Sequence, residues 1–445
     1  MNSLDKKYLD FNKSEIIDLD KVTLDKINLI INEYIRKFTL EDIVEKTNEV
    51  LGTITVISEL YDYLDEKDEC DKYIYILMDK LRKQMTSGIY IHEISLYGGL
   101  AEVGLAVYIL NKQTGNYGKF LDTINELIID ILPGTLNYLN YNINNLRMFD
   151  YDVVTGISGI IGYLLNFSNR PKILELIKES LDYLIKLTKN INVSEYEVPG
   201  WYISRDNQFR DDEKETFKNG NFNYGLSHGV AGILTALSLA FKQDIVINGQ
   251  REAIEKIIKE YKDIKLLDNK RIPFWPGQYS FEDYIEHNPD SSTLGRKMSW
   301  CYGSIGILRA LKLSAMALND QILKKWVSEK VNIISKININ EYNLGSPTLC
   351  HGYSGLMLLL LIEYKENPNI ELQSRIKELL YKVLNSYDEN SIYGFINIEN
   401  YEISEKIVIE KTEDNSFLTG TSGVILAIIS AIKYYTYFDR QLMIN

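Results

Sequence analysis

A short motif recurs along the chain and restricts its fold more than any other feature. In this motif two glycines stand three residues apart and are followed at once by an apolar run. A degenerate copy, Gly99-Leu-Ala-Glu102, lacks the second glycine. The intervals between copies are each long enough for two helices and a loop, so the sequence predicts a repeat fold. The intact copies are Gly156-Ile-Ser-Gly159, Gly229-Val-Ala-Gly232, Gly303-Ser-Ile-Gly306, Gly352-Tyr-Ser-Gly355 and Gly420-Thr-Ser-Gly423.

Two kinds of helix are predicted around these motifs. The segment after a motif is strongly apolar and is expected to be an inner helix, as in Ile233 to Phe241, Ile307 to Leu318 and Val424 to Tyr435. The stretches between motifs are amphipathic, because their apolar residues recur three and four positions apart, and these are expected to be outer helices. The outer segments are Lys172 to Lys189, Ile254 to Ile264, Ile322 to Ile337 and Leu372 to Tyr387.

The stacking of these units is expected to be closed rather than open. A repeat of this kind cannot bury its apolar face alone, so the units must pack on one another. The inner segments are apolar on most faces, which favours a ring of inner helices inside an outer layer over an open solenoid. We therefore predict an all-α fold, a double-layered α/α barrel. Its glycine loops would gather at one end and form the site there.

We predict one domain over residues 1–445, because the repeat pattern outweighs the length, which alone would suggest about three domains. A chain with 45% hydrophobic and 25% charged residues can bury a large core. The longest irregular stretch, residues 190–223, is expected to be an insertion or a long loop over the site. The segment before Leu40 is polar enough to lie at the periphery.

Charge and polarity exclude several classes of protein. The net charge of -13 argues against a nucleic-acid partner and suits a cationic peptide. The polar N-terminus has no secretory signal, and the apolar runs are shorter than the roughly 20 residues that span a bilayer. We expect a cytoplasmic protein, and a peripheral contact with a membrane stays open.

Three glycine loops carry reactive residues one or two positions before their first glycine. If the loops converge, Cys301, Cys350 and His351 bring two thiols and an imidazole together, which is a suitable ligand set for zinc. Such a set leaves the fourth tetrahedral position open, as in catalytic zinc sites. The three loops are Ser227-His228-Gly229, Trp300-Cys301-Tyr302-Gly303 and Cys350-His351-Gly352.

Ordinary core packing is the alternative explanation, because cysteines outside disulfides are among the most buried residues. Two of only three cysteines and two of only four histidines fall in equivalent loops, which favours one zinc ion. A closed structural site would need a fourth protein ligand. Cys70 lies outside the loops, whereas His228 could supply that ligand instead of acting in catalysis. Trp300 is expected in the core, and Tyr302 either in the core or at the pocket.

The segments Gly-Leu-Ser-His-Gly, Ser-Trp-Cys-Tyr-Gly and Cys-His-Gly-Tyr-Ser-Gly resemble the lanthionine synthetase C-like family. The resemblance runs from Ser95 to Gly423 and includes Asn219-Gly-Asn-Phe-Asn-Tyr-Gly before His228. It implies an α/α toroid of about seven helix pairs with one zinc and an added segment for a peptide leader. The glycine pattern reveals six of the loops.

The resemblance also implies the activity. A dehydratase converts serine and threonine residues of a precursor peptide to dehydroalanine and dehydrobutyrine, and the cyclase adds cysteine thiols to them. The products are the thioether rings of lanthipeptides. The implied partners are the dehydrated precursor with its leader, the dehydratase and a peptide transporter, in a complex at the inner face of the membrane.

Roles for individual residues follow from the same resemblance. Zinc would deprotonate the substrate thiol, and its attack at Cβ gives an enolate that needs a proton at Cα. His228 matches the non-ligand histidine and is the candidate donor. Asp152 matches the acidic residue and would orient His228 or the substrate, although a helix N-cap explains it nearly as well. The arginine of the family is Lys297 here, with Arg296 one step earlier, so the source of the cation is open between them.

Two other function classes compete with the cyclase. A zinc-stabilised helical scaffold that binds peptides would need a closed site with four ligands and no catalytic acid. A glycoside-processing α/α barrel would use two carboxylates. Asp152 and Glu102 are the only carboxylates in the repeat loops, which offer thiols and imidazole instead. The loop chemistry therefore favours the cyclase.

Overall fold

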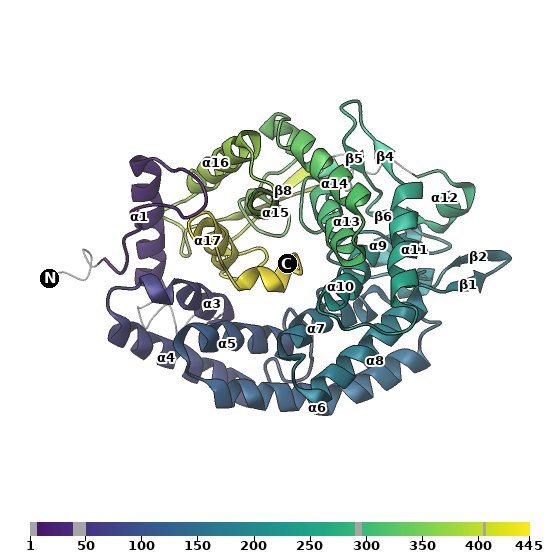
Figure 1. The fold of residues 1–445 in the computed structure, drawn as a ribbon, viewed down its shortest axis with the longest axis horizontal. Helices are drawn as coiled ribbons and strands as arrows, with labels where there is room; N and C mark the ends of the chain where they lie inside the picture. The colour runs from purple at the N-terminus through teal and green to yellow at the C-terminus, as the bar shows by residue number, and fades with distance from the viewer. Residues whose placement is uncertain (1–6, 39–49, 290–295, 404–405) are drawn as a thin grey trace. The chain divides into compact units, whose positions relative to one another are not determined.

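The computed structural model describes residues 7–38, 50–289, 296–403 and 406–445 (Figure 1). Helices dominate these residues, and the strands described form four two-stranded antiparallel sheets. The predicted all-α class is therefore confirmed. The chain divides into two compact units. The first unit comprises Met1–Ile89, Leu105–Leu121 and Asn343–Phe438, and the second comprises Tyr90–Gly104, Asp122–Tyr342 and Asp439–Asn445.

The inner helices of the second unit are buried on nearly every side. In α10 (Val230–Lys242) all residues up to Ala240 are buried, and most of them are apolar. It packs against both α7 (Ile157–Leu164) and α13 (Ser304–Leu318). Each of these helices begins directly after the first glycine of a motif. The N-cap residues are Gly156, Gly229 and Gly303.

The motif glycines are needed for space rather than for an unusual backbone angle. Gly303 has a φ of -81°, which any residue can adopt. A Cβ at Gly303 would lie 2.1 Å from the carbonyl oxygen of Lys297, and a Cβ at Gly306 would lie 2.1 Å from that of Trp300. The spacing of the glycines therefore marks the place where a loop folds back onto the first turn of an inner helix.

Outer helices of the second unit alternate with the inner ones and are amphipathic. The pairs α7/α8, α10/α11 and α13/α14 each pack together. Asp320 is the N-cap of α14, because its carboxylate accepts hydrogen bonds from the N–H groups of Ile322 and Leu323. The bounds are Pro171–Leu187 for α8, Gln250–Asp263 for α11 and Gln321–Ile334 for α14, close to the predicted segments.

The first unit is built in the same way. The inner helix α15 (Tyr353–Glu366) packs against its outer partner α16 (Ile370–Leu384) and against the inner helix α17 (Thr421–Ser430). The predicted extension of the last inner helix to Tyr435 is wrong, because α17 ends at Ser430 and Tyr435 is exposed.

One inner helix of the first unit was not predicted. Every residue of α3 (Val50–Leu60) is buried, and the helix packs against α17 and against α4 (Lys67–Thr86). Gly52 allows this approach, because a Cβ there would lie 2.3 Å from the hydroxyl oxygen of Ser422. No glycine pair precedes α3, so only its continuous apolar run could have revealed it.

The N-terminal segment is an outer helix with a buried apolar face, rather than a merely peripheral stretch. Helix α1 (Lys21–Phe38) buries Ile27, Ile31 and Phe38 and packs against α16. Two further long helices among the described residues are α5 (Leu100–Thr114), which begins directly after Gly99 of the degenerate motif, and α6 (Gly118–Tyr141). None of the described helices combines the length and the apolar character of a membrane span.

The irregular stretch at residues 190–223 is structured. It contains the hairpin β1 (Asn190–Val193) and β2 (Tyr196–Pro199), a short helix α9 (Asp211–Thr216) and the strand β3 (Asn221–Asn223). A later segment holds it in place, since β3 pairs with β6 (Gln278–Ser280). The later segment also contains β4 (Leu266–Leu267), β5 (Pro273–Phe274) and α12 (Phe281–Glu286).

Candidate functional site

Backbone hydrogen bonds join neighbouring glycine loops of the second unit. The N–H of Val153 donates to the carbonyl oxygen of Ser227 at 3.0 Å. The carbonyl oxygen of Cys301 accepts from the N–H groups of Leu226 and Ser227 at 2.6 and 3.2 Å. These bonds hold three loops against one another at the starts of α7, α10 and α13, so the loops of this unit do meet.

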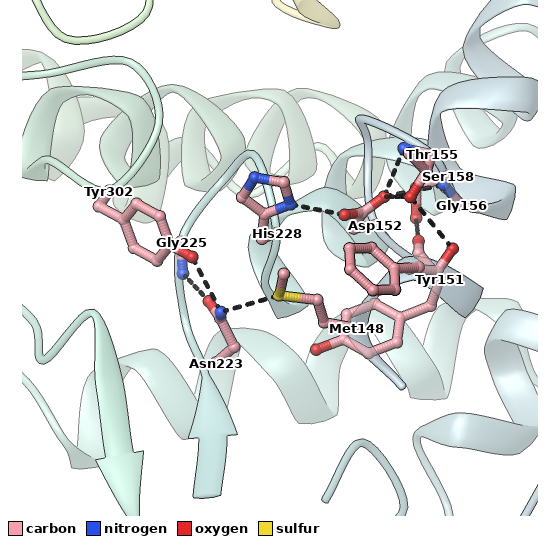
Figure 2. A network of polar contacts seen from close by, with 11 residues as sticks. Met148, Tyr151, Asp152, Thr155, Gly156, Ser158, Asn223, Gly225, His228 and Tyr302 are labelled. Atoms are coloured by element: carbon pink, nitrogen blue, oxygen red, sulfur yellow. Dashed lines mark hydrogen bonds and ion pairs between the residues drawn. The ribbon is translucent and has the colours of Figure 1, made fainter. Parts of the chain in front are cut away.

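His228 and Asp152 form the central side-chain pair of these loops (Figure 2). Nδ1 of His228 lies 2.6 Å from Oδ2 of Asp152. Asp152 is fully buried, whereas 27% of the His228 side chain is exposed. Because an ionised carboxylate can only accept, Nδ1 donates and Nε2 is left to exchange a proton with a ligand. Figure 2 shows Nε2 on the ring edge that points away from Asp152.

The other oxygen of Asp152 organises its own loop. Oδ1 accepts from the N–H groups of Thr155 and Gly156 at 2.7 and 2.8 Å. The sequence leaves three roles open for Asp152, which are orienting His228, orienting the substrate and capping a helix. The structure shows the first contact directly, and in place of a helix cap it shows a hydrogen-bonded turn just before α7. The buried carboxylate thus has donors at both oxygens, which offset the cost of its burial.

Tyr302 lies beside His228 on the side away from Asp152 (Figure 2), with 6.3 Å between the two ring centroids. Its hydroxyl accepts a hydrogen bond of 3.0 Å from Nδ2 of Asn223, a residue that the sequence did not single out. A Cβ at Gly225 would lie 2.6 Å from the tyrosine ring, so the ring rests on the glycine backbone. Burial raises the pKa of Tyr302, which keeps the phenol protonated at neutral pH.

The thiol of Cys301 belongs to the same set of loops. It is half-buried and donates to the hydroxyl oxygen of Ser299 at 3.5 Å. Its main chain is held by the loop of His228, as described above. Trp300 is 1% exposed and donates its indole N–H to the carbonyl oxygen of Leu442 at 3.0 Å, which confirms its expected place in the core.

Cys350 and His351 lie in the first unit, in the loop before α15. The N–H of Cys350 donates to the carbonyl oxygen of Leu418 at 2.9 Å, which joins two glycine loops of this unit. Nε2 of His351 lies 3.3 Å from Oδ1 of Asn397 and 3.5 Å from Oε1 of Glu399. Both partners come from β7 (Asn397–Ile403), which pairs with β8 (Lys406–Thr412).

The predicted zinc ligands have suitable chemistry. Among the described residues no group of three or more Cys, His, Asp or Glu side chains is assembled to hold a metal ion. Cys301 belongs to the second unit, and Cys350 and His351 belong to the first. All three cysteines are outside disulfides, but the thiols of Cys301 and Cys350 are half-buried whereas that of Cys70 is buried. Thiol and imidazole donors suit zinc. The zinc site therefore stays a prediction.

The two candidate cations differ in their surroundings. Arg296 is exposed, and its guanidinium lies 4.9 Å from the centre of the Phe274 ring in β5. Lys297 is half-buried and stands one residue nearer to Cys301. The structure thus directs the arginine towards the aromatic ring of Phe274 in β5.

Comparison with known proteins gives a family match and two similar curated proteins. Residues 49–440 match the model of the family "Lanthionine synthetase C-like protein". The nisin biosynthesis protein NisC of Lactococcus lactis subsp. lactis is 28% identical over 403 residues, which cover 88% of this chain and 87% of that protein. The lacticin 481/lactococcin biosynthesis protein LcnDR2 of the same organism is 25% identical over 302 residues, which cover 64% of this chain but 26% of that protein.

A solved structure named nisin cyclase is also similar. It matches with a TM-score of 0.77 and 24% sequence identity, over 96% of this chain and 98% of that one. At this level of identity the match establishes the fold. The predicted α/α toroid is therefore confirmed.

Proposed function

Because the chain belongs to the lanthionine synthetase C-like family, we propose that it is a zinc-dependent cyclase acting on a dehydrated precursor peptide. Family membership makes it a lanthipeptide cyclase, an enzyme that forms thioether bonds. The proposed reaction adds cysteine thiols to dehydroalanine and dehydrobutyrine, giving lanthionine and methyllanthionine rings in lantibiotic biosynthesis. The observation that carries this proposal is the hydrogen bond between the buried Asp152 and His228. The loop of His228 is in turn hydrogen-bonded to the main chain of Cys301.

The reaction is an addition in which nothing is oxidised or reduced. A sulfur–carbon bond forms at Cβ of the dehydro residue, and the electrons of the double bond move towards the carbonyl to give an enolate. A proton then adds at Cα. The thiol gives up one proton and Cα receives one, so the mass of the peptide does not change.

Cys301, Cys350 and His351 would hold the zinc. Two thiolates and an imidazole leave one position for the sulfur of the substrate, as catalytic zinc sites require. Bound zinc would supply the thiolate, because a coordinating thiol is deprotonated whereas an ordinary cysteine has a pKa of about 8.5. This role is supported by the positions of the three residues, since Cys301 and Cys350 each stand two positions before a motif glycine and His351 stands one position before it.

His228 would deliver the proton to Cα. Its Nδ1–H is engaged by Asp152, so Nε2 is the nitrogen that can carry the transferred proton. Imidazole suits this task because it titrates near neutral pH. Asp152 would stabilise the imidazolium and fix the ring, and would act through His228 as a positioning residue.

The enolate needs a positive or hydrogen-bonding neighbour while it exists. Of the two candidate cations, Lys297 is the better choice, because the guanidinium of Arg296 is placed over Phe274. Lys297 also stands at the position that the family gives to its arginine.

We further propose that the substrate keeps its leader and that a dehydratase and a peptide transporter assemble with the cyclase. The complex would lie in the cytoplasm at the inner face of the membrane. The net charge of -13 would favour a cationic precursor, since opposite charges increase the rate of encounter.

The test uses the purified full-length protein and a dehydrated precursor peptide encoded beside its gene. Because the mass is unchanged, ring formation is followed by counting thiols that remain open to alkylation. The unchanged protein should bind one zinc and consume thiols. Cys301→Ala should lose zinc and leave the thiols, and His228→Ala should keep zinc but form rings slowly or at wrong positions.

Retained zinc with complete ring formation in Cys301→Ala would contradict the proposal. Loss of zinc in His228→Ala would make His228 a fourth ligand. In that case the zinc-stabilised scaffold would become the better explanation.

A further inference from the structure

Two oxygen atoms from β7 face one nitrogen of His351. Nε2 lies 3.3 Å from Oδ1 of Asn397 and 3.5 Å from Oε1 of Glu399. The imidazole is 22% exposed, so one edge is held by the strand while the ring keeps access to solvent. Neither acceptor belongs to the glycine loop itself.

The hydrogen-bond partners of Asn397 determine which way its amide points. Nδ2 donates to Oε1 of Glu399 at 2.9 Å, and a carboxylate oxygen can only accept. Oδ1 must therefore face His351, and it also accepts from the hydroxyl of Ser346 at 2.8 Å. Since both atoms opposite Nε2 are acceptors, Nε2 carries the hydrogen and Nδ1 carries the lone pair.

A buried network keeps this arrangement in place. Asn397 is 4% exposed and Ser346 is 1% exposed. The hydroxyl oxygen of Ser346 accepts from Thr348 at 3.1 Å and from the N–H of Ile398 at 3.3 Å. These bonds join the start of β7 to the loop that continues into Cys350 and His351. A fully bonded buried network of this kind restricts the side chains to one arrangement.

We propose that Asn397 and Glu399 are positioning residues that hold His351 with Nδ1 available to bind zinc. The proposal rests on the zinc-dependent function described above. A metal-bound histidine almost always donates its other ring N–H to an oxygen acceptor, which fixes the tautomer and the ring orientation. Asn397 and Glu399 supply that acceptor here, 46 and 48 positions after His351 in the sequence.

Zinc affinity of the full-length protein tests this inference, measured by competition with a chelator. Asn397→Leu removes the amide at similar size, and loss of such an acceptor should raise the dissociation constant for zinc roughly 10- to 100-fold. Glu399→Gln, at a half-exposed position, should raise it by less. Glu410→Gln is the matched control, because exposed Glu410 stands opposite Glu399 on β8 and undergoes the same change. Its affinity should match that of the unchanged protein.

Thermal unfolding of the zinc-free proteins separates positioning from general stability. A positioning role predicts that Glu399→Gln weakens zinc binding without lowering the unfolding temperature of the zinc-free form. If the unchanged protein binds zinc, Cys350→Ala does not, and both β7 variants bind as tightly as the control, the inference about β7 is overturned and the proposed function stands. If the unchanged protein binds no zinc, the zinc-dependent function fails and this inference fails with it.

Discussion

His228 and His351 both stand immediately before a motif glycine, yet their rings are held by opposite nitrogens. Asp152 engages Nδ1 of His228 and leaves Nε2, whereas Asn397 and Glu399 engage Nε2 of His351 and leave Nδ1. The neighbours therefore give the two imidazoles different chemistry. In the proposed function, His228 would exchange a proton beside a buried carboxylate, and His351 would offer a lone pair to the zinc.

Asp152→Asn tests the role of the carboxylate at nearly constant volume. The new amide oxygen would still accept the hydrogen bonds from the N–H groups of Thr155 and Gly156, so the NH2 group would face His228. Nδ1 would then have to accept, and the imidazolium would lose its stabilising charge. Loss of general acid catalysis should slow ring formation roughly 10²- to 10⁴-fold. The rate of thiol consumption measures this effect.

Zinc content is the control for this variant, since Asp152 is not a predicted ligand. It should stay at the level of the unchanged protein. Ring formation at the normal rate would show that the pair of Asp152 and His228 does not act in proton transfer.

The helices follow a simple rule, in which apolar runs become inner helices and amphipathic runs become outer ones. Two helices illustrate how far the rule reaches. The fully buried α3 obeys it without any glycine pair, because close contact with α17 depends on the single Gly52. The N-terminal α1 obeys it as an outer helix that packs against α16. The glycine pair is thus a steric feature of particular loops and not a requirement of every repeat.

Glycine substitutions test this steric explanation. Gly306→Ala places a Cβ 2.1 Å from a backbone carbonyl, so the loop before α13 must shift, and overpacking of this kind should cost about 1–3 kcal/mol. Gly134 in α6 is the matched control, because a Cβ there would meet no atom within 4 Å apart from its chain neighbours and the backbone of its own helix. Gly134→Ala should stabilise the protein by up to about 1 kcal/mol, because alanine favours helix. Chemical denaturation of both variants measures the two changes, and equal effects would contradict the explanation.

At the scale of the whole molecule, the fold shared with nisin cyclase and the family match over residues 49–440 establish a lanthipeptide cyclase. Each unit has inner helices that bury their whole surface and outer helices that bury one face. The motif loops precede inner helices in both units, and these loops carry Cys301, Cys350 and His351.

Zinc should stabilise the whole molecule if the proposed ligands bind it in the folded state. A metal that binds only the folded chain adds about 2.7 kcal/mol when its free concentration is 100 times its dissociation constant. A chelator should therefore lower the unfolding temperature of the unchanged protein. Cys350→Ala should unfold at the same temperature with and without the chelator. If the chelator does not lower the unfolding temperature of the unchanged protein, that result would argue against a bound zinc.

The sequence by itself determined the helical class and the two kinds of helix, because both depend on local periodicity and on the apolar character of short segments. It also located the reactive loops, since a glycine pair beside cysteine and histidine is a local signal. The residue types in those loops pointed to zinc and to the family. The sequence did not predict α3, which has no glycine motif before it, and it did not predict the buried face of α1.

Only the tertiary structure decided which side chains meet. The carboxylate of Asp152 reaches a histidine 76 positions later, and Asn397 reaches one 46 positions earlier. The sequence around Asn397 gives no sign that this residue contacts His351. The contact depends on the pairing of β7 with β8 and on the hydroxyl of Ser346. Packing also placed Arg296 over Phe274 and so distinguished it from Lys297. Such contacts arise between distant segments, and the spacing of residues along one chain does not encode them.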